Sequence, residues 1–393
     1  MSSLFTPLTF GNVTIKNRFE HSATYEAMAS EAGEVTDKLV LRYQVLAKGE
    51  VGLIIPGHMF VHPHGRAGQF QTGIHSDKMI PGLKHLVDAV HKEGGKIFLQ
   101  ISHAGRQTKK SLIGRRPMGP SSFDRDPTNL VKAAEMSKAE IMDSIAAYGE
   151  AARRAVEAGA DGIQLHAAHG YLINQFLSPY FNKRKDEWGG SDENRFSFLK
   201  EVIQICRETM PSGMPLSVKL NTQDFTPNEG IIPPLASKYG TWLKEMNVDG
   251  LELSCGSPVY AFMNMCRGDV PLDELLAGLP GWKKPMGRIM LKKMIGKFEL
   301  KEGYNVDAAK LIKPRLNGTT LAVVGGFRSL SYMENLVAQG HADLIAMSRP
   351  FIREPHILLQ FKNGRKDKVS CLSCNKCLAA VANEQAVRCY SKV

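Results

Sequence analysis

The segment DGIQLHAAHGYLINQFLSPYFNKRKDEWGGSDENR, residues 161–195, carries the strongest structural signal in this chain. It begins with a short apolar strand at Asp161–Leu165 and ends where a helix starts. His166, His169 and Tyr171 follow the strand directly, so their side chains can converge beyond its C-terminal end. Two imidazoles and a phenol at one strand tip predict a site that binds an electron-rich group and supplies a proton.

Seven further strand-like segments occur along the chain, and amphipathic helical stretches alternate with them. The expected strands lie near Phe19–Ser22 and at Val51–Ile55, Lys96–Ile101, Leu216–Leu220, Asp249–Leu253, Thr320–Val324 and Leu344–Met347. Short, continuously apolar strands that alternate with helices indicate a parallel sheet covered on its outer faces. Eight such units in this length predict an α/β fold of the (β/α)8 TIM-barrel type rather than an open doubly wound sheet.

Two segments do not belong to this alternation. Residues 109–136 are polar and irregular, and residues 255–300 form a long insertion after the sixth strand. Both are expected on the catalytic face of the barrel, where loops shape substrate pockets. We predict one barrel domain at residues 1–362 and a short cysteine-containing extension at residues 363–393.

Composition and charge favour a globular enzyme. The chain has 393 residues, of which 43% are hydrophobic and 23% charged. No apolar run approaches the roughly 20 residues that span a bilayer, and the N-terminus does not resemble a signal peptide, so we expect a cytoplasmic protein without membrane contact. The net charge of +11 is spread out and no RNA-recognition motif is present. It therefore indicates an anionic substrate or cofactor rather than nucleic acid.

Polar residues at the tips of the last two strands predict a phosphate site. Gly325, Gly326 and Arg328 follow the seventh strand, and Ser348 and Arg349 follow the eighth. Barrels of this type hold phosphate at these two strand ends, where glycine admits the oxygens to backbone N–H groups and arginine offers a planar fork.

The segment HAAHGYLINQFLSPYFNKRKDEWGGSDENR resembles the Old Yellow Enzyme family of FMN-dependent ene-reductases. That family also includes 2,4-dienoyl-CoA reductase and trimethylamine dehydrogenase. Further matches are PLTFGNVTIKNR near the start, QISHAGR at 100–106, VVGGFR at 323–328 and ADLIAMSRPFIREP at 342–355. The resemblance covers nearly all of residues 5–360 and implies a barrel that holds FMN non-covalently at its mouth.

The resemblance also implies which residues contact FMN. Those near the flavin ring are Ser22, Ala23, Thr24, Gly57, Gln100 and Lys219, and those at the phosphate are Gly325, Gly326, Ser348 and Arg349. Lys219 matches a position near the N1–C2 carbonyl edge, where family members commonly have arginine. Lysine supplies the positive charge but not the bidentate fork. Tyr25 departs from the Cys or Thr of several members, so flavin potential or pocket size is expected to differ.

The family chemistry agrees with the residues at the fourth strand tip. The resemblance implies that His166 and His169 hold the electron-withdrawing oxygen of the substrate and that Tyr171 donates the proton. Flavin reduced by NAD(P)H gives hydride to the β-carbon of an activated C=C bond. Paired imidazole N–H groups can stabilise the charge that builds on the oxygen, and a phenol is protonated at neutral pH.

Four of the seven cysteines lie near the C-terminus, at Cys371, Cys374, Cys377 and Cys389. The pattern CxxCxxC with a distant fourth cysteine is a ligand set for a [4Fe-4S] iron–sulfur cluster. It is similar to the arrangement that follows the barrel in trimethylamine dehydrogenase and 2,4-dienoyl-CoA reductase. Zinc, or no metal, remain alternatives. A cluster here would need an electron-transfer partner protein or another subunit.

The leading functional hypothesis is an NAD(P)H-dependent FMN ene-reductase that acts on a small α,β-unsaturated carbonyl or enoyl compound. An amine dehydrogenase-like oxidoreductase is the alternative, which Tyr171 and the paired histidines disfavour. A flavin-dependent tRNA dihydrouridine synthase is less favoured, because its catalytic cysteine is expected after the third strand, where this chain has Ile101, Ser102 and His103. The physiological substrate and a homo-oligomeric state stay open.

Overall fold

Eight parallel strands form a closed barrel in the computed structural model, which describes residues 3–123 and 132–391. The strands are β3 (Phe19–His21), β4 (Leu53–Ile54), β6 (Lys96–Ser102), β9 (Gly162–Ala167), β10 (Leu216–Asn221), β11 (Gly250–Ser254), β12 (Thr320–Val324) and β13 (Leu344–Met347). Each pairs with the next in this order, and β13 pairs with β3 to close the ring. The predicted (β/α)8 architecture is confirmed, and β12 and β13 have the predicted bounds.

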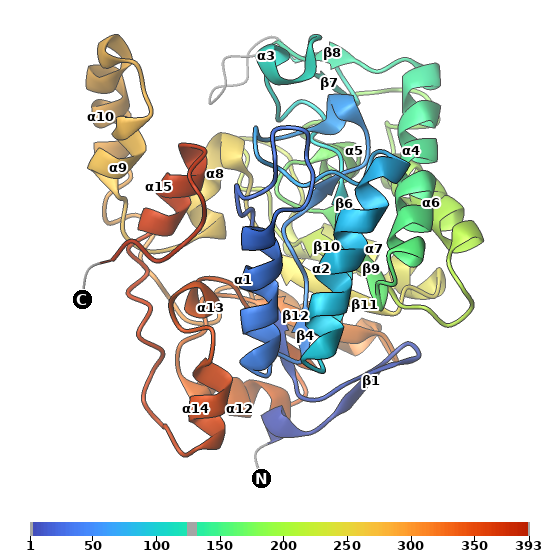
Figure 1. The fold of residues 1–393 in the computed structure, drawn as a ribbon. Coiled ribbons are helices and arrows are strands. Elements are labelled where there is room, and N and C mark those ends of the chain that lie inside the picture. Colours follow the sequence, from blue (N-terminus) through green and yellow to red (C-terminus); the bar gives the residue numbers. More distant parts are fainter. Residues whose placement is uncertain (1–2, 124–131, 392–393) are drawn as a thin grey trace.

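Helices surround the barrel on its outer side (Figure 1). They are α1 (Asp37–Lys48), α2 (Ile80–Lys92), α4 (Lys138–Glu157), α6 (Asp192–Thr209), α7 (Pro233–Glu245), α11 (Val306–Ile312), α12 (Leu330–Ala338), α13 (Arg349–Arg353) and α14 (Ile357–Lys362). Helix α6 begins at Asp192, inside the 161–195 segment whose end was expected to mark the start of a helix. The Ser191 hydroxyl accepts the N–H of Asn194 at 3.1 Å, which stabilises this first turn.

A hairpin near the N-terminus lies against the bottom of the barrel. It pairs β1 (Leu8–Phe10) with β2 (Val13–Ile15), and the sequence analysis assigned no element to it. Phe10, Val13 and Ile15 belong to a small buried cluster with inward-facing residues such as Phe98. A Cβ on Gly250 would lie 2.2 Å from the Phe10 ring, so glycine is needed for this close approach. The N-terminal end of the barrel is therefore apolar and filled, which leaves the C-terminal end for a site.

The segment at 109–136 contains α3 (Lys110–Ile113), β7 (Met118–Gly119) and β8 (Ala134–Glu135), while residues 124–131 lie outside the described part. The insertion at 255–300 forms α8 (Pro258–Met265), α9 (Leu272–Ala277) and α10 (Lys284–Lys292). In Figure 1, α9 and α10 extend away from the barrel beside α15 (Lys376–Ala382). Among the described helices, none is both long and apolar enough to cross a membrane.

The C-terminal extension packs on the end of the barrel where the strands end. The Val369 N–H donates to the Arg328 carbonyl at 3.1 Å, and the Val387 N–H donates to the Glu26 carbonyl at 2.8 Å. The Tyr25 hydroxyl donates to Glu384 at 2.8 Å. These contacts bring the cysteine segment to the end of the barrel that carries the polar strand tips.

Candidate active site

The turn after β9 brings the three predicted catalytic side chains together. The His166 ring centroid lies 5.1 Å from that of His169 and 4.8 Å from that of Tyr171. The turn requires a left-handed backbone at His169 (φ +59°) and Gly170 (φ +71°). The Asn174 side chain, on α5 (Leu172–Leu177), accepts the Gly170 N–H at 2.6 Å and holds the turn. A non-glycine residue in this conformation is uncommon and supports a functional role.

A fourth ring, His58, joins this cluster from the loop after β4. Its centroid lies 4.7 Å from that of Tyr171 and 5.6 Å from that of His166. Its Nε2 is 3.3 Å from the Tyr171 hydroxyl. Sequence reasoning missed His58, although its place directly after Gly57 at a strand tip was a usable signal.

Burial controls the protonation of this cluster. Burial, together with the Lys219 cation, lowers the pKa of His58 to about 4 and those of His166 and His169 well below the usual range. Burial raises the pKa of Tyr171. At neutral pH the site therefore holds three neutral imidazoles and a protonated phenol. The buried His166 Nδ1 has no hydrogen-bond partner among the described residues, so a ligand atom can bind there.

A buried polar network lies inside the same end of the barrel. Lys219 Nζ is 2.9 Å from Glu252 Oε1 and 2.8 Å from Ser22 Oγ, and Ser22 donates to Glu252 at 2.6 Å. Gln100 donates to Gln164 at 2.5 Å, which donates to Glu252 at 3.2 Å. Three of the residues expected at the flavin ring, Ser22, Gln100 and Lys219, thus share one network. Sequence reasoning missed Gln164 and Glu252. Side chains alternate between the two faces of a strand, and this alternation points both residues into the barrel, where they join the network.

The residues expected at the phosphate lie on the loops after β12 and β13. Gly326 has a left-handed backbone (φ +71°) that favours glycine. The Ser348 and Thr24 hydroxyls are 2.6 Å apart and join the β13 and β3 tips. Arg349 Nη1 donates to the Arg267 carbonyl at 2.8 Å and to Asn375 Oδ1 at 2.5 Å, which fixes this guanidinium against the insertion and the extension.

Gly57 is needed at its position for steric reasons. Its N–H donates to Glu26 Oε1 at 2.7 Å, and a Cβ there would lie 2.3 Å from the other carboxylate oxygen. Ala23 and Thr24 are half-buried at the β3 tip, beside buried Ser22.

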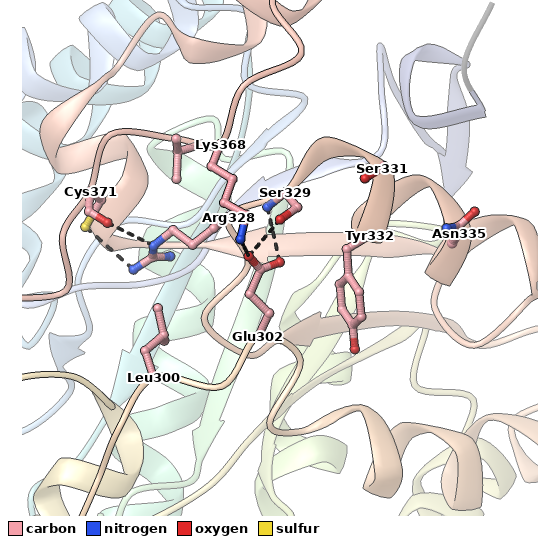
Figure 2. A pocket seen from close by; sticks show the side chains of 10 residues that line it. Leu300, Glu302, Arg328, Ser329, Ser331, Tyr332, Asn335, Lys368 and Cys371 are labelled. Carbon is pink, nitrogen blue, oxygen red and sulfur yellow. Dashed lines mark hydrogen bonds and ion pairs between the residues drawn. The ribbon is translucent and has the colours of Figure 1, made fainter. Parts of the chain in front are cut away.

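Arg328 lies beside an open pocket of about 620 Å³ on the outer side of the β12 loop (Figure 2). Its guanidinium donates to the carbonyl and sulfur of Cys371, at 3.2 and 3.6 Å, and to the Ser373 hydroxyl at 2.7 Å. Glu302 and Lys368 also line this pocket, and none of the histidine cluster does. Arg328 therefore holds the cysteine segment in place. Its position after two glycines had instead predicted a contact with phosphate.

The four C-terminal cysteines carry free, partly exposed thiols. Within residues 3–123 and 132–391, no group of three or more ligand side chains is arranged to hold a metal ion. Arg353 Nη1 donates to Cys389 Sγ at 3.2 Å. Burial, opposed by Arg349 and aided by neighbouring thiols such as Cys266 and Cys371, raises the pKa of Cys377 to about 12. Cys266 of the insertion thus lies near this segment, a position that the sequence did not indicate.

A (β/α)8 barrel that gathers neutral imidazoles, a phenol and a buried lysine at its C-terminal end has the architecture of a flavin-dependent oxidoreductase. The chain belongs to the NADH:flavin oxidoreductase / NADH oxidase family, whose model matches residues 3–265. It is 36% identical over 355 residues to an NADPH dehydrogenase of Geobacillus sp. (strain WCH70), covering 90% of this chain and 92% of that protein. An NADPH dehydrogenase of Clostridium acetobutylicum is 33% identical over 356 residues, covering 91% and 93%.

Solved structures show the same fold. The chain matches 2-naphthoyl-CoA reductase in complex with 2-naphthoyl-CoA (25% identity, TM-score 0.85) and histamine dehydrogenase from Rhizobium sp. 4-9 (22%, 0.82) over 98% of its own length. It spans 56% and 52% of those two chains. The Old Yellow Enzyme homologue from Zymomonas mobilis is 24% identical with a TM-score of 0.72, covering 95% of this chain and 96% of that one. These findings confirm the predicted family, an oxidoreductase class that uses FMN and NAD(P)H.

Proposed function

We propose that this enzyme reduces the activated C=C bond of a small α,β-unsaturated carbonyl or enoyl compound with electrons from NADPH. The observation that carries this proposal is a cluster of two neutral imidazoles and a protonated phenol at the barrel mouth, in which the His166 ring contacts both His169 and Tyr171. Neutral imidazoles can donate N–H groups to a carbonyl oxygen, and the phenol can give a proton nearby.

FMN fits the residues present, because one end of the barrel has a buried cation, glycine-lined loops and a buried His166 nitrogen that has no hydrogen-bond partner among the described residues. The proposed ring contacts are Ser22, Ala23, Thr24, Gly57, Gln100 and Lys219, and the proposed phosphate contacts are Gly325, Gly326, Ser348 and Arg349. Bound FMN in its reduced form supplies the hydride for the β-carbon.

The protein residues then perform two tasks. His166 and His169 hold the substrate oxygen on which negative charge builds, and the Ser254 hydroxyl, 2.7 Å from His169 Nε2, fixes that ring. Tyr171 transfers its proton to the α-carbon: the O–H bond breaks, a C–H bond forms with the electron pair of the former double bond, and the oxygen keeps the O–H pair as a phenolate.

Purified protein is expected to be yellow and to release FMN on denaturation, because the proposed contacts are non-covalent. Its bound flavin should bleach with NADPH under anaerobic conditions and recover its colour when an enone such as 2-cyclohexenone is added, whereas an alkylamine should not bleach it. Reduction by an amine would favour the amine dehydrogenase alternative. Colourless protein that FMN cannot reconstitute would refute the proposal.

We further propose that the cysteine segment binds a [4Fe-4S] cluster through Cys371, Cys374, Cys377 and Cys389. Cluster binding would draw these thiols together, since no three ligand side chains of the described residues are arranged to hold a metal ion. Spacing and donor chemistry support it, as do the Arg328 and Arg353 N–H groups at two of the sulfurs, since such donors stabilise ligating thiolates. A cluster would let the enzyme exchange electrons with a partner protein.

Anaerobically purified protein should contain about four iron and four sulfide per chain. Cys374→Ser should lower both strongly, while Cys206→Ala, at a buried cysteine of α6 outside the segment, should leave them unchanged. Iron near zero in the anaerobic wild-type protein, measured by colorimetric analysis, would exclude the cluster, and a stoichiometric zinc content would identify the alternative metal.

A further inference from the structure

His58 is held on one side by two hydrogen-bonding groups and contacts Tyr171 on the other. The side chain is buried, and its Nδ1 lies 2.8 Å from Ser102 Oγ and 2.9 Å from Gln71 Nε2. Its Nε2 lies 3.3 Å from the Tyr171 hydroxyl. Among the hydrogen bonds of the described residues, those of Gln71 and Ser102 reach the cluster only at His58, so we expect both to act on Tyr171 through this ring.

The backbone around Gln71 orients the amide that faces His58. The Gln71 amide oxygen accepts the Ala67 N–H at 2.7 Å, so its nitrogen must face the histidine. That nitrogen donates one hydrogen to the His58 carbonyl and has its second hydrogen directed at Nδ1, both at 2.9 Å. An Nδ1 that accepts a hydrogen bond carries no proton. When Nδ1 accepts this hydrogen bond from Gln71, the neutral ring has its hydrogen on Nε2 and donates it to the Tyr171 oxygen.

We propose that His58 is a positioning residue that holds the Tyr171 hydroxyl and stabilises the phenolate formed when Tyr171 gives up its proton. This inference rests on the proposed function, in which Tyr171 is the acid. With its oxygen accepting from His58 Nε2, the phenol directs its own hydrogen elsewhere, towards the substrate. After transfer, the same N–H becomes a charge-assisted donor to the phenolate, which is stronger than its bond to the neutral phenol.

This role is needed because the phenol is buried. Burial raises the pKa of Tyr171, which slows proton donation unless a partner stabilises the anion. The groups that face His58 are the rings of His166, Tyr25 and Tyr171, with the Lys219 cation acting from β10. Since burial and Lys219 lower the pKa of His58 to about 4, the ring stays neutral at physiological pH.

The test compares variants of the full-length, FMN-loaded enzyme during oxidation of its reduced flavin by 2-cyclohexenone. His58→Leu removes the donor and should slow this step by about 10- to 100-fold, the range for a hydrogen bond to a charged group. It should also increase the solvent deuterium isotope effect, because proton transfer becomes rate-limiting. His58→Gln places an amide N–H near the former Nε2 and should recover most of the rate. His85→Leu, at an exposed histidine of α2, is the matched control.

The Tyr171→Phe background separates the two proposals. If His58 acts through Tyr171, adding His58→Leu to Tyr171→Phe should change the rate less than twofold. An equal loss in both backgrounds, or a wild-type isotope effect in His58→Leu, would overturn the role of His58. If Tyr171→Phe alone leaves the oxidation rate unchanged while His58→Leu lowers it, the proposed acid is wrong and so is the positioning role.

Discussion

Tyr171→Phe is expected to slow the oxidation of reduced flavin by an enone by about 10²- to 10⁴-fold, the usual contribution of a positioned general acid. Phenylalanine keeps the ring, which contacts His166 and His58 at 4.8 and 4.7 Å, and removes only the hydroxyl. The loss should therefore appear in proton transfer rather than in folding or cofactor binding. Anaerobic stopped-flow absorbance of the flavin measures the step directly.

Flavin reduction by NADPH is the internal reference for this variant, because that half-reaction needs no proton from Tyr171. Tyr332→Phe is the matched control, since this tyrosine is 38% exposed on α12 and lies outside the histidine cluster. Equal slowing of both half-reactions would point to a disturbed flavin site. An unchanged oxidation rate in Tyr171→Phe would exclude this phenol as the acid.

The barrel could be predicted from the sequence because each strand is a short apolar run between helices. Thr320–Val324 and Leu344–Met347 were predicted with their observed bounds. The contact of His166, His169 and Tyr171 also follows from the sequence, since the three lie within six residues of one strand tip. Spacing along the sequence is therefore sufficient to predict a site when all of its residues lie in or next to one turn.

Residues that reach the site from other strands could not be predicted with the same ease. His58 lies 113 positions before Tyr171, and its orientation depends on Gln71 and Ser102, which belong to two further segments. Glu252 joins Lys219 because the β10–β11 register places them side by side. The sequence pattern predicts both strands, but it predicts neither the register between them nor the partners of their side chains.

The N-terminal hairpin and the GGFR arginine show two other limits. Strands of three residues, such as β1 and β2, give too little alternation for a pattern to identify them. Arg328 follows two glycines at a strand tip, a context typical of phosphate binding, yet its guanidinium contacts Cys371 and Ser373. The direction of a long side chain depends on which segment packs above it, and here that segment is more than 40 residues away along the chain.

Lys219→Met should destabilise the full-length protein by about 3–5 kcal/mol, the usual cost of removing one partner of a buried ion pair. Lys219 and Glu252 are almost completely buried, with Nζ and Oε1 2.9 Å apart, so the variant leaves a carboxylate without its counter-charge. The nearby Glu20 carboxyl group should add to this loss of stability. Burial and the neighbouring Glu252 carboxylate already raise the pKa of Glu20 well above its usual range, and Lys219 is the cation that opposes this.

Urea unfolding of the flavin-free protein, followed by circular dichroism, measures this effect without a contribution from cofactor binding. Lys200→Met, at an exposed lysine of α6, should shift the free energy of unfolding by less than about 0.5 kcal/mol. The double variant Lys219→Met with Glu252→Gln should be more stable than Lys219→Met alone, because glutamine removes the orphaned charge and can still accept from Gln164 while donating to the Ser22 hydroxyl. If the double variant is as unstable as the single one, packing of the lysine stem rather than its charge stabilises this end of the barrel.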